Sequence, residues 1–291
     1  MGERATLNVL DRAIAWAAPE RALRRAGARH ALAQYEAASP GKQRQGRRSR
    51  GGPDTAVLRA GTSLREQARH LDENHDLAKG ILNVLVQNVV GPHGSGIEPQ
   101  PRRKDGSVHE ELASDLLNLL RDWSRRPEVT REHDWPAAQR MAARTWFRDG
   151  ECLSQILAGT VRGLDHGTRV PLSLELLEPD LLPLDFHDPS QNIIQGVQTN
   201  DWGRPVRYHL YKHHPANSQI LARGQDRKTV EAGNMLHLKA TDRIRQVRGV
   251  SVFASVLMRL DDVKDYEESE RVAAKVAASM AAFIKKGTPE D

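Results

Sequence analysis

Apolar residues recur at helical spacing in the first half of the chain. Ser63-Leu64-Arg65-Glu66 has the spacing of a capping box, and the apolar positions from Leu71 to Val89 then predict one or two packed helices. A glycine-rich run at 91–96 ends this pattern. Glycines there could cradle a phosphate, but the Lys-Ser/Thr pair of a P-loop is absent, so we interpret the run as a loop.

Two more helices are predicted before residue 150. Leucines between Val108 and Trp123 describe an amphipathic helix, which Arg125-Arg126-Pro127 ends. Trp135-Pro136 begins the next helix, which runs toward Arg148-Asp149-Gly150-Glu151. Its apolar residues are typical of core packing.

Short apolar runs replace the helical spacing from about residue 170. Leu172 to Leu177 predicts a strand, and the runs 193–199 and 206–211 predict a hairpin around Asn200-Asp201-Trp202-Gly203. Pro205 places its strand near an edge, because proline cannot donate a ladder hydrogen bond. A further strand at 235–238 would complete a small sheet.

The last predicted element is a long helix from about Val252 to Ile284, with charged residues concentrated in 261–271. At ~1.5 Å per residue, such a helix would be about 50 Å long. That length favours a strut or an assembly element. Together the helices and the small sheet predict an α+β fold.

Charge is distributed unevenly along the chain. Residues 1–52 hold eleven Lys or Arg and four Asp or Glu, so this segment alone carries a net charge of +7. The whole chain carries +5. The remaining residues hold 32 Lys or Arg and 34 Asp or Glu, a balance of −2. A protein that grips nucleic acid through its folded surface usually spreads basic residues over that surface, so we do not expect the folded body to act in this way.

We interpret residues 1–54 as a basic and partly flexible N-terminal arm. Pro, Gly, Ser and like charges in 37–54 are typical of a connector. The candidate contacts to DNA phosphates, scaffold or neighbouring subunits are Lys42, Arg44, Arg47, Arg48 and Arg50. A solvated tail is the alternative that we favour.

Other features narrow the class of protein. The sequence has no apolar run of the roughly 18 to 20 residues that a membrane span needs, so we expect no membrane partner. A single cysteine, Cys152, excludes an internal disulfide and does not suggest a zinc site. It lies in an apolar helical or strand-like run, which predicts a buried, inert thiol in a reducing compartment.

Only two groups of residues are candidates for a catalytic or metal-binding site. His209, His213 and His214 could be metal ligands, but no carboxylate near them in the sequence completes a set. The acidic residues of 175–188 could serve a two-metal nuclease, although loop solvation is favoured: Glu175, Glu178, Asp180, Asp185 and Asp188. We therefore predict no catalytic, metal-binding or cofactor-binding residues, no cofactor, and a protein that is not an enzyme.

Several strings, taken in order, resemble the lambda-type portal family of tailed phages. They lie at 77–80, 88–91, 97–100, 148–152, 177–182, 203–206, 208–210, 242–243, 246–251, 265–268 and 272–278. Each string is weak alone, but their order and spacing cover roughly residues 55–286. Family members continue beyond the last helix, so the resemblance implies that the C-terminal part of the family is missing from this chain.

The resemblance implies a fold and a role. It implies a helical wing-like region at 55–164, a β-rich clip-like region at 165–248, and a long stem-like helix with the chain end at 249–291. The implied function is a ring of twelve subunits at one capsid vertex of the virion, assembled in the host bacterial cytoplasm. The implied partners are further copies of the chain, terminase, major capsid and scaffold proteins, head-tail joining proteins, and double-stranded DNA that passes through non-specifically.

The charge distribution agrees with that role, because a strongly basic lining would hold each phosphate and stall a sliding polyanion. Two other hypotheses remain open from the residues alone. The first is a nucleic-acid-binding module that uses the basic arm, and the second is a metal-dependent nuclease that uses the acidic residues of 175–188.

Overall fold

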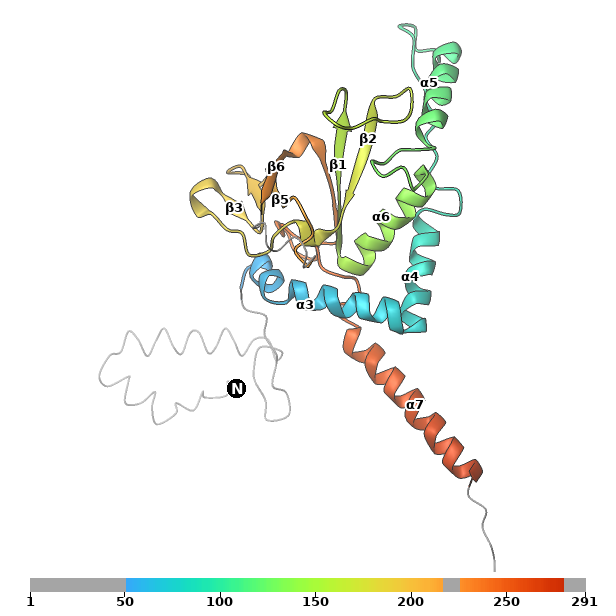
Figure 1. The fold of residues 1–291 in the computed structure, drawn as a ribbon, viewed down its shortest axis with the longest axis vertical. Coiled ribbons are helices and arrows are strands. Elements are labelled where there is room, and N and C mark those ends of the chain that lie inside the picture. Colours follow the sequence, from blue (N-terminus) through green and yellow to red (C-terminus); the bar gives the residue numbers. More distant parts are fainter. Residues whose placement is uncertain (1–50, 217–225, 280–291) are drawn as a thin grey trace, which may run out of the picture. The chain divides into compact units, whose positions relative to one another are not determined.

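Four helices form the first half of the structure, a computed structural model that describes residues 51–216 and 226–279 (Figure 1). They are α3 (Pro53–Asn74), α4 (Asp76–Val89), α5 (Glu110–Trp123) and α6 (Trp135–Asp149). The helical pattern up to Val89, which predicted one or two helices, forms two. The leucine-rich helix and the helix that begins at Trp135-Pro136 are confirmed. The loop expected after Val89 is also present, because no helix or strand is assigned between 90 and 101.

Helix α3 begins ten residues before the predicted capping box, so that part of the prediction is wrong. Pro53 lies in its first turn, where the missing N–H of proline costs nothing. Ser63 is inside the helix, and its hydroxyl accepts a hydrogen bond from the side-chain amide of Gln67 at 2.9 Å. The spacing of a capping box therefore arose within a continuing helix.

The strands form two antiparallel sheets. The first has the order β2 (Leu172–Leu177), β1 (Glu151–Ala158) and β7 (Met235–Lys239). The second has the order β3 (Ile193–Ile194), β4 (Val197–Thr199), β5 (Pro205–Tyr211) and β6 (Arg227–Glu231). The predicted strand at 172–177 and the hairpin between β4 and β5 are confirmed.

Three strand predictions need correction. The strand expected at 235–238 is present, but the predicted small sheet is divided into two, and this strand lies beside β1 in the sheet without the hairpin. The run 193–199 is divided in two, because Gln195 and Gly196 make a turn with φ of 51° and 80°. Strand β5 is internal, and Pro205 is tolerated as its first residue, outside the part that pairs with β6.

Strand β1 lies inside the segment 55–164, which was predicted to be helical. The segment is helical only as far as Asp149. Gly150 then adopts a left-handed conformation that ends α6, and the next residue starts the central strand of the first sheet. The described residues therefore mix helices with antiparallel sheets, as an α+β fold requires.

One apolar core lies between the two sheets. It contains Leu153, Leu177, Leu182, Val197, Tyr208, Leu210, Val230 and Met235. A second cluster joins α3 and α4 to the start of the last helix through Ala68, Leu71, Ala78, Leu82, Phe253 and Leu257. Helix α6 contacts α3, α4 and β1 and so links the two clusters.

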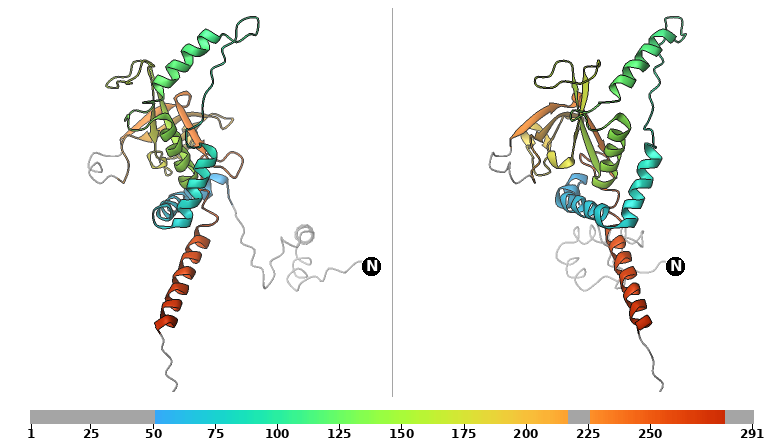
Figure 2. Two further views of the ribbon diagram at one scale, coloured as in Figure 1. Left: turned by 90° about the vertical axis from the view of Figure 1, so that its right-hand side faces the viewer. Right: turned by 45° about the vertical axis from the view of Figure 1, so that its right-hand side comes forward.

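Helix α7 (Leu257–Ser279) is the described part of the predicted long helix, and its expected continuation to Ile284 lies outside the described residues. Its first turn packs on the second cluster, and Lys264 donates a hydrogen bond to the backbone carbonyl of Asn74. Every residue of 264–279 is exposed. Both views in Figure 2 show α7 continuing away from α3 and α4 with no other described helix or strand beside it. No described helix has the length and apolar character to cross a bilayer.

Candidate functional site: a buried ionic centre

A fully buried ion pair joins Arg248 to Glu151 at the start of β1. Both side chains have no exposed surface. The guanidinium Nε donates to the carboxylate at 2.9 Å, and Nη2 donates to Oε1 at 2.5 Å. The remaining N–H groups of Arg248 donate to the backbone carbonyls of Leu182, Gln195 and Pro179 at 2.8–3.1 Å. One side chain therefore ties two separate segments, the turn at 179–182 and the turn at Gln195, to the first sheet.

Glu151 has further partners that keep it ionised. His237 Nε2 lies 3.0 Å from its Oε2, the backbone N–H of Gly249 donates to the same oxygen at 3.0 Å, and Arg65 donates to Oε1 at 3.3 Å. Burial alone would raise the pKa of the Glu151 carboxyl. The charge of Arg248 and the His237 hydrogen bond outweigh burial and hold that pKa far below its ordinary value. The pKa of His237 is lowered, chiefly by burial.

A second group of charges extends the centre along α3 and α6. Arg69 Nη2 lies 2.8 Å from a carboxylate oxygen of Asp149 and 2.5 Å from one of Asp180. Arg148 Nε also donates to Asp149, at 2.8 Å. Burial alone would lower the pKa of Arg69, but Asp149 and Asp180 raise it above its ordinary value. The charged groups are thus paired with one another within the protein.

Three of the strings that carry the portal resemblance meet at this centre. The string 148–152 supplies Glu151, 177–182 supplies Asp180 with the carbonyls of Pro179 and Leu182, and 246–251 supplies Arg248. Gly150 allows the end of α6 to approach the backbone of Val250 closely, because a Cβ placed on Gly150 would lie 2.2 Å from the carbonyl carbon of Val250. The resemblance therefore marks positions that build the fold.

Such a centre does not support acid–base catalysis. A general acid or base needs a pKa near the working pH and access to its substrate. Glu151 and Arg248 are completely buried, and the pKa of Glu151 is shifted away from neutrality. We therefore interpret the centre as a scaffold for the surrounding loops.

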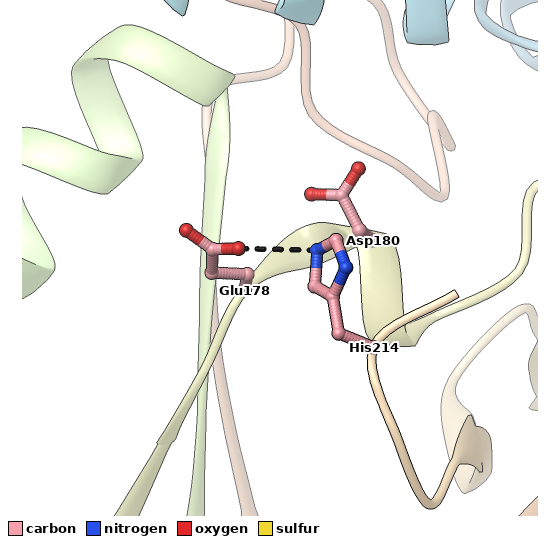
Figure 3. A group of neighbouring side chains, drawn as sticks. All are labelled: Glu178, Asp180 and His214. Atoms are coloured by element: carbon pink, nitrogen blue, oxygen red, sulfur yellow. Dashed lines mark ion pairs between the residues drawn. The ribbon is translucent and has the colours of Figure 1, made fainter. Parts of the chain in front are cut away.

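Glu178, Asp180 and His214 form a small surface cluster in which one potential ligand atom of each lies within 4.8 Å of the others (Figure 3). We expected no carboxylate near His209, His213 and His214. This expectation is wrong for His214, because the fold brings Glu178 Oε2 to 3.3 Å from His214 Nε2. Asp180 is already paired with Arg65 and Arg69, at 3.3 and 2.5 Å. A dication would sit beside two guanidinium groups, so the cluster fits ion pairing better than metal binding.

His209 is not part of that cluster. Its ring packs edge-on against Phe186, with the ring centroids 5.4 Å apart. Burial and the nearby Arg227 and Arg207 lower its pKa. A shared metal site for the three predicted histidines is therefore not formed among the described residues.

Two of the other acidic residues of 175–188 serve separate local contacts. Glu175 pairs with Lys228 at 2.7 Å, and Asp188 accepts hydrogen bonds from the backbone and side chain of Ser190. Besides the cluster in Figure 3, no group of acidic side chains from 175–188 converges in the part of the chain that the structure describes. This arrangement disfavours the two-metal nuclease, which requires carboxylates that converge.

The predicted basic contacts cannot be placed on this site. Lys42, Arg44, Arg47, Arg48 and Arg50 lie outside the described residues. What the sequence reasoning missed is the ionic centre itself. Its local signal is weak, because Glu151 is the first residue of β1 and Arg248 lies between Val247 and Gly249-Val250, but nothing near either residue in the sequence pairs the two.

An apolar groove of about 290 Å³ lies between α6 and the first sheet. Its walls include Trp135, Trp146, Leu236 and Leu238, and Cys152 is the one titratable residue that lines it. The groove therefore lacks an acid–base pair of its own.

We expect Cys152 to resist alkylation in the folded protein. Its side chain is buried, and burial together with Asp149 and Glu151 raises its pKa to about 12. Relative to the ordinary value of 9.0, this lowers the thiolate fraction at neutral pH about a thousandfold. Iodoacetamide labelling followed by mass spectrometry should show slow modification in buffer and rapid modification in denaturant. Equal rates in both conditions would contradict the buried environment.

Comparison with known proteins places these features in a family. The family model described as "Phage portal protein, lambda family" matches residues 39–291. A curated relative, "Probable portal protein" of Halomonas phage phiHAP-1, is 25% identical over 246 residues. The alignment covers 83% of this chain and 46% of that relative, so the chain spans about half the length of the curated relative that it matches.

Proposed function

The chain belongs to the lambda family of phage portal proteins, and we propose that it is a structural, non-catalytic subunit of a portal ring at one capsid vertex. In this proposal, twelve copies surround a channel through which double-stranded DNA passes. The ring binds terminase during packaging, contacts major capsid and scaffold proteins during assembly, and later binds the head-tail joining proteins. Assembly takes place in the host bacterial cytoplasm.

The use of charge inside the fold is the observation that best supports a structural role. Glu151, Arg248, Arg65 and Asp149 are buried and paired with one another or with neighbouring charges. Three of them, Asp149, Glu151 and Arg248, lie in strings that resemble the family, so these shared positions hold segments of the fold together. The body outside the arm carries 32 Lys or Arg and 34 Asp or Glu, which suits a conduit that must release phosphates.

We assign the parts of the chain to the proposed ring as follows. Helices α3 to α6 correspond to the wing, the two sheets contain the clip, and α7 corresponds to the stem. The exposure of α7 beyond Lys264 supports the last assignment, because a stretch of helix that packs on no other described element is available to neighbouring subunits. A cyclic ring needs two different surfaces on each subunit, which interact heterologously.

Self-association tests the proposal directly. We expect sedimentation velocity of the purified full chain to show one discrete, high-mass species that contains many copies. Its sedimentation coefficient should remain fixed as protein concentration rises, because a closed ring stops growing once it is complete. A monomer or a dimer at every concentration would contradict the proposal.

The two alternative functions predict different results. If the basic arm makes the chain a nucleic-acid-binding module, deletion of residues 1–52 removes nearly all affinity for DNA. If the acidic residues form a nuclease, magnesium or manganese supports DNA cleavage that Asp180→Asn or Asp185→Asn abolishes. The ion pairs of Asp180 with Arg65 and Arg69 favour neither cleavage nor metal binding.

A further inference from the structure

The four most exposed large apolar side chains of the described residues lie in only two places. Ile244 and Trp202 are 93% and 88% exposed and belong to two loops. Met258 and Tyr266 are 82% and 66% exposed and belong to the first half of α7. Because large apolar side chains gain free energy when they leave water, such exposure at two separate places points to two interaction surfaces.

The first surface consists of residues 200–204 and 241–245, which we call the loop pair. The two loops adjoin, because a Cβ placed on Gly203 would lie 3.3 Å from a guanidinium nitrogen of Arg245. Trp202, Arg204, Ile244 and Arg245 are all exposed. The described residues offer no ion-pair partner to Arg204 or Arg245.

Internal hydrogen bonds fix the shape of the loop pair. Asn200 Oδ1 accepts from the backbone N–H groups of Trp202 and Arg204 at 3.1 and 2.9 Å. In the other loop, the buried Gln246 accepts from the backbone N–H groups of Asp242 and Arg243 at 3.2 Å and donates to the carbonyl of Arg248. The loop 200–204 is thus fixed by its own hydrogen bonds, and the loop 241–245 is anchored on the backbone of Arg248. A pre-formed surface of this kind loses little conformational entropy on binding.

Arg245 provides independent evidence of a constrained surface. Its φ is 65°, a left-handed conformation that is unfavourable for a residue with a side chain. The neighbouring Gly203 has a φ of 80°, which glycine tolerates. Backbone strain of this kind tends to occur at functional surfaces, where the surrounding structure maintains it.

The second surface is the outer face of α7, which we define as Met258, Asp262, Asp265 and Tyr266. Their spacing of i, i+4, i+7 and i+8 places them on one side of the helix. Leu257 and Leu260 belong to the side that packs on the second apolar cluster.

The outer face of α7 is acidic. Residues 261–270 contain six Asp or Glu and one Lys. None of these carboxylates is ion-paired with another described residue. The outer face therefore combines exposed apolar groups with uncompensated negative charge, the opposite sign to that of Arg204 and Arg245.

We propose that the loop pair of one copy docks on the outer face of α7 of a second copy. Trp202 and Ile244 pack against Met258 and Tyr266, while Arg204 and Arg245 pair with Asp262 and Asp265. Trp and Arg are the residue types that most often dominate the energy of protein interfaces. The two surfaces differ, so the contact is heterologous and repeats from copy to copy around a ring. This inference rests on the proposed function, because it names the contact that assembles the ring.

A second copy explains both surfaces better than DNA does. Phosphates would be repelled by residues 261–270, and double-stranded DNA keeps its bases stacked away from Trp202 and Ile244. One contact between copies satisfies both surfaces and their opposite charges.

Charge reversal tests the contact in the full chain by sedimentation velocity. Arg204→Glu with Arg245→Glu places like charges together and should weaken self-association at least about a hundredfold. Asp262→Arg with Asp265→Arg should have a similar effect. The chain that carries all four substitutions restores opposite charges and should assemble as the wild type does.

A matched control carries Arg126→Glu with Arg162→Glu. These two arginines are exposed and have no ion-pair partner among the described residues, so the control changes net charge equally and should leave assembly intact. Suppose that the wild type assembles. If the Arg204/Arg245 variant then assembles equally well, or if the four substitutions together fail to restore assembly, the inference is overturned and the proposed function is not. A wild type that stays monomeric overturns the proposed function and the inference with it.

Discussion

Arg248→Met is expected to remove about 3–5 kcal/mol from the free energy of unfolding. The substitution leaves the Glu151 carboxylate buried without its main counter-charge. It also removes the donors for the backbone carbonyls of Leu182, Gln195 and Pro179, which join two segments, 179–182 and the turn at Gln195, to the first sheet. Since domains are typically stable by about 5–15 kcal/mol, the loss would bring the protein close to unfolding at ambient temperature.

Urea unfolding followed by circular dichroism measures this loss, with Arg169→Met as the matched control. Arg169 is 69% exposed and pairs with Asp122 at the surface, so its replacement should cost about 0–1 kcal/mol. An Arg248→Met protein with the same unfolding midpoint as the control would show that the buried pair does not hold the loops together.

Gly150→Ala is expected to be comparably damaging, at about 2–5 kcal/mol, for a different reason. Gly150 has a φ of 88°, and an added Cβ would lie 2.2 Å from the carbonyl carbon of Val250 and 2.5 Å from the amide nitrogen of Ser251. The backbone itself would have to move, and with it the junction between α6 and β1 and the segment that carries Arg248.

Gly163→Ala separates steric overlap from backbone conformation. Gly163 has a φ of 80°, but an added Cβ would meet no atom within 4 Å. Its replacement should cost only the left-handed strain, about 1–2 kcal/mol. Thermal unfolding of both variants should therefore show a clearly larger loss for Gly150→Ala. Equal losses would mean that the close approach to Val250 and Ser251 is not important.

Local signals in the sequence predicted the helices and the hairpin well. Trp135-Pro136 marked the start of α6 because proline is favoured in a first helical turn, and Gly150 marked its end. The turn at 200–203 predicted the hairpin of β4 and β5, and its internal hydrogen bonds to Asn200 show why those residues form a turn. In each case the information lies within a few residues of the element.

Long-range pairing was beyond the reach of such signals. The run 235–238 has the pattern of a strand, but nothing in it specifies β1, far earlier in the sequence, as its partner. The ionic centre was missed for a similar reason. Arg65, Glu151 and Arg248 look like ordinary surface charges until the fold brings them within hydrogen-bonding distance of one another.

The length and exposure of α7 favour a role in assembly. The sequence predicted a long helix as a strut or an assembly element, and the described helix Leu257–Ser279 is exposed from residue 264 onward. Its acidic outer face was not foreseen as a partner for the loop pair, because the loops are defined by contacts between residues 200–204 and 241–245. The wing, clip and stem assignments stay proposals.

Negative-stain electron microscopy of the purified full chain tests most directly whether this protein works by self-association. The account predicts class averages of closed rings with a central channel and a fixed number of subunits. Particles of monomer size, or filaments of variable length, would contradict it.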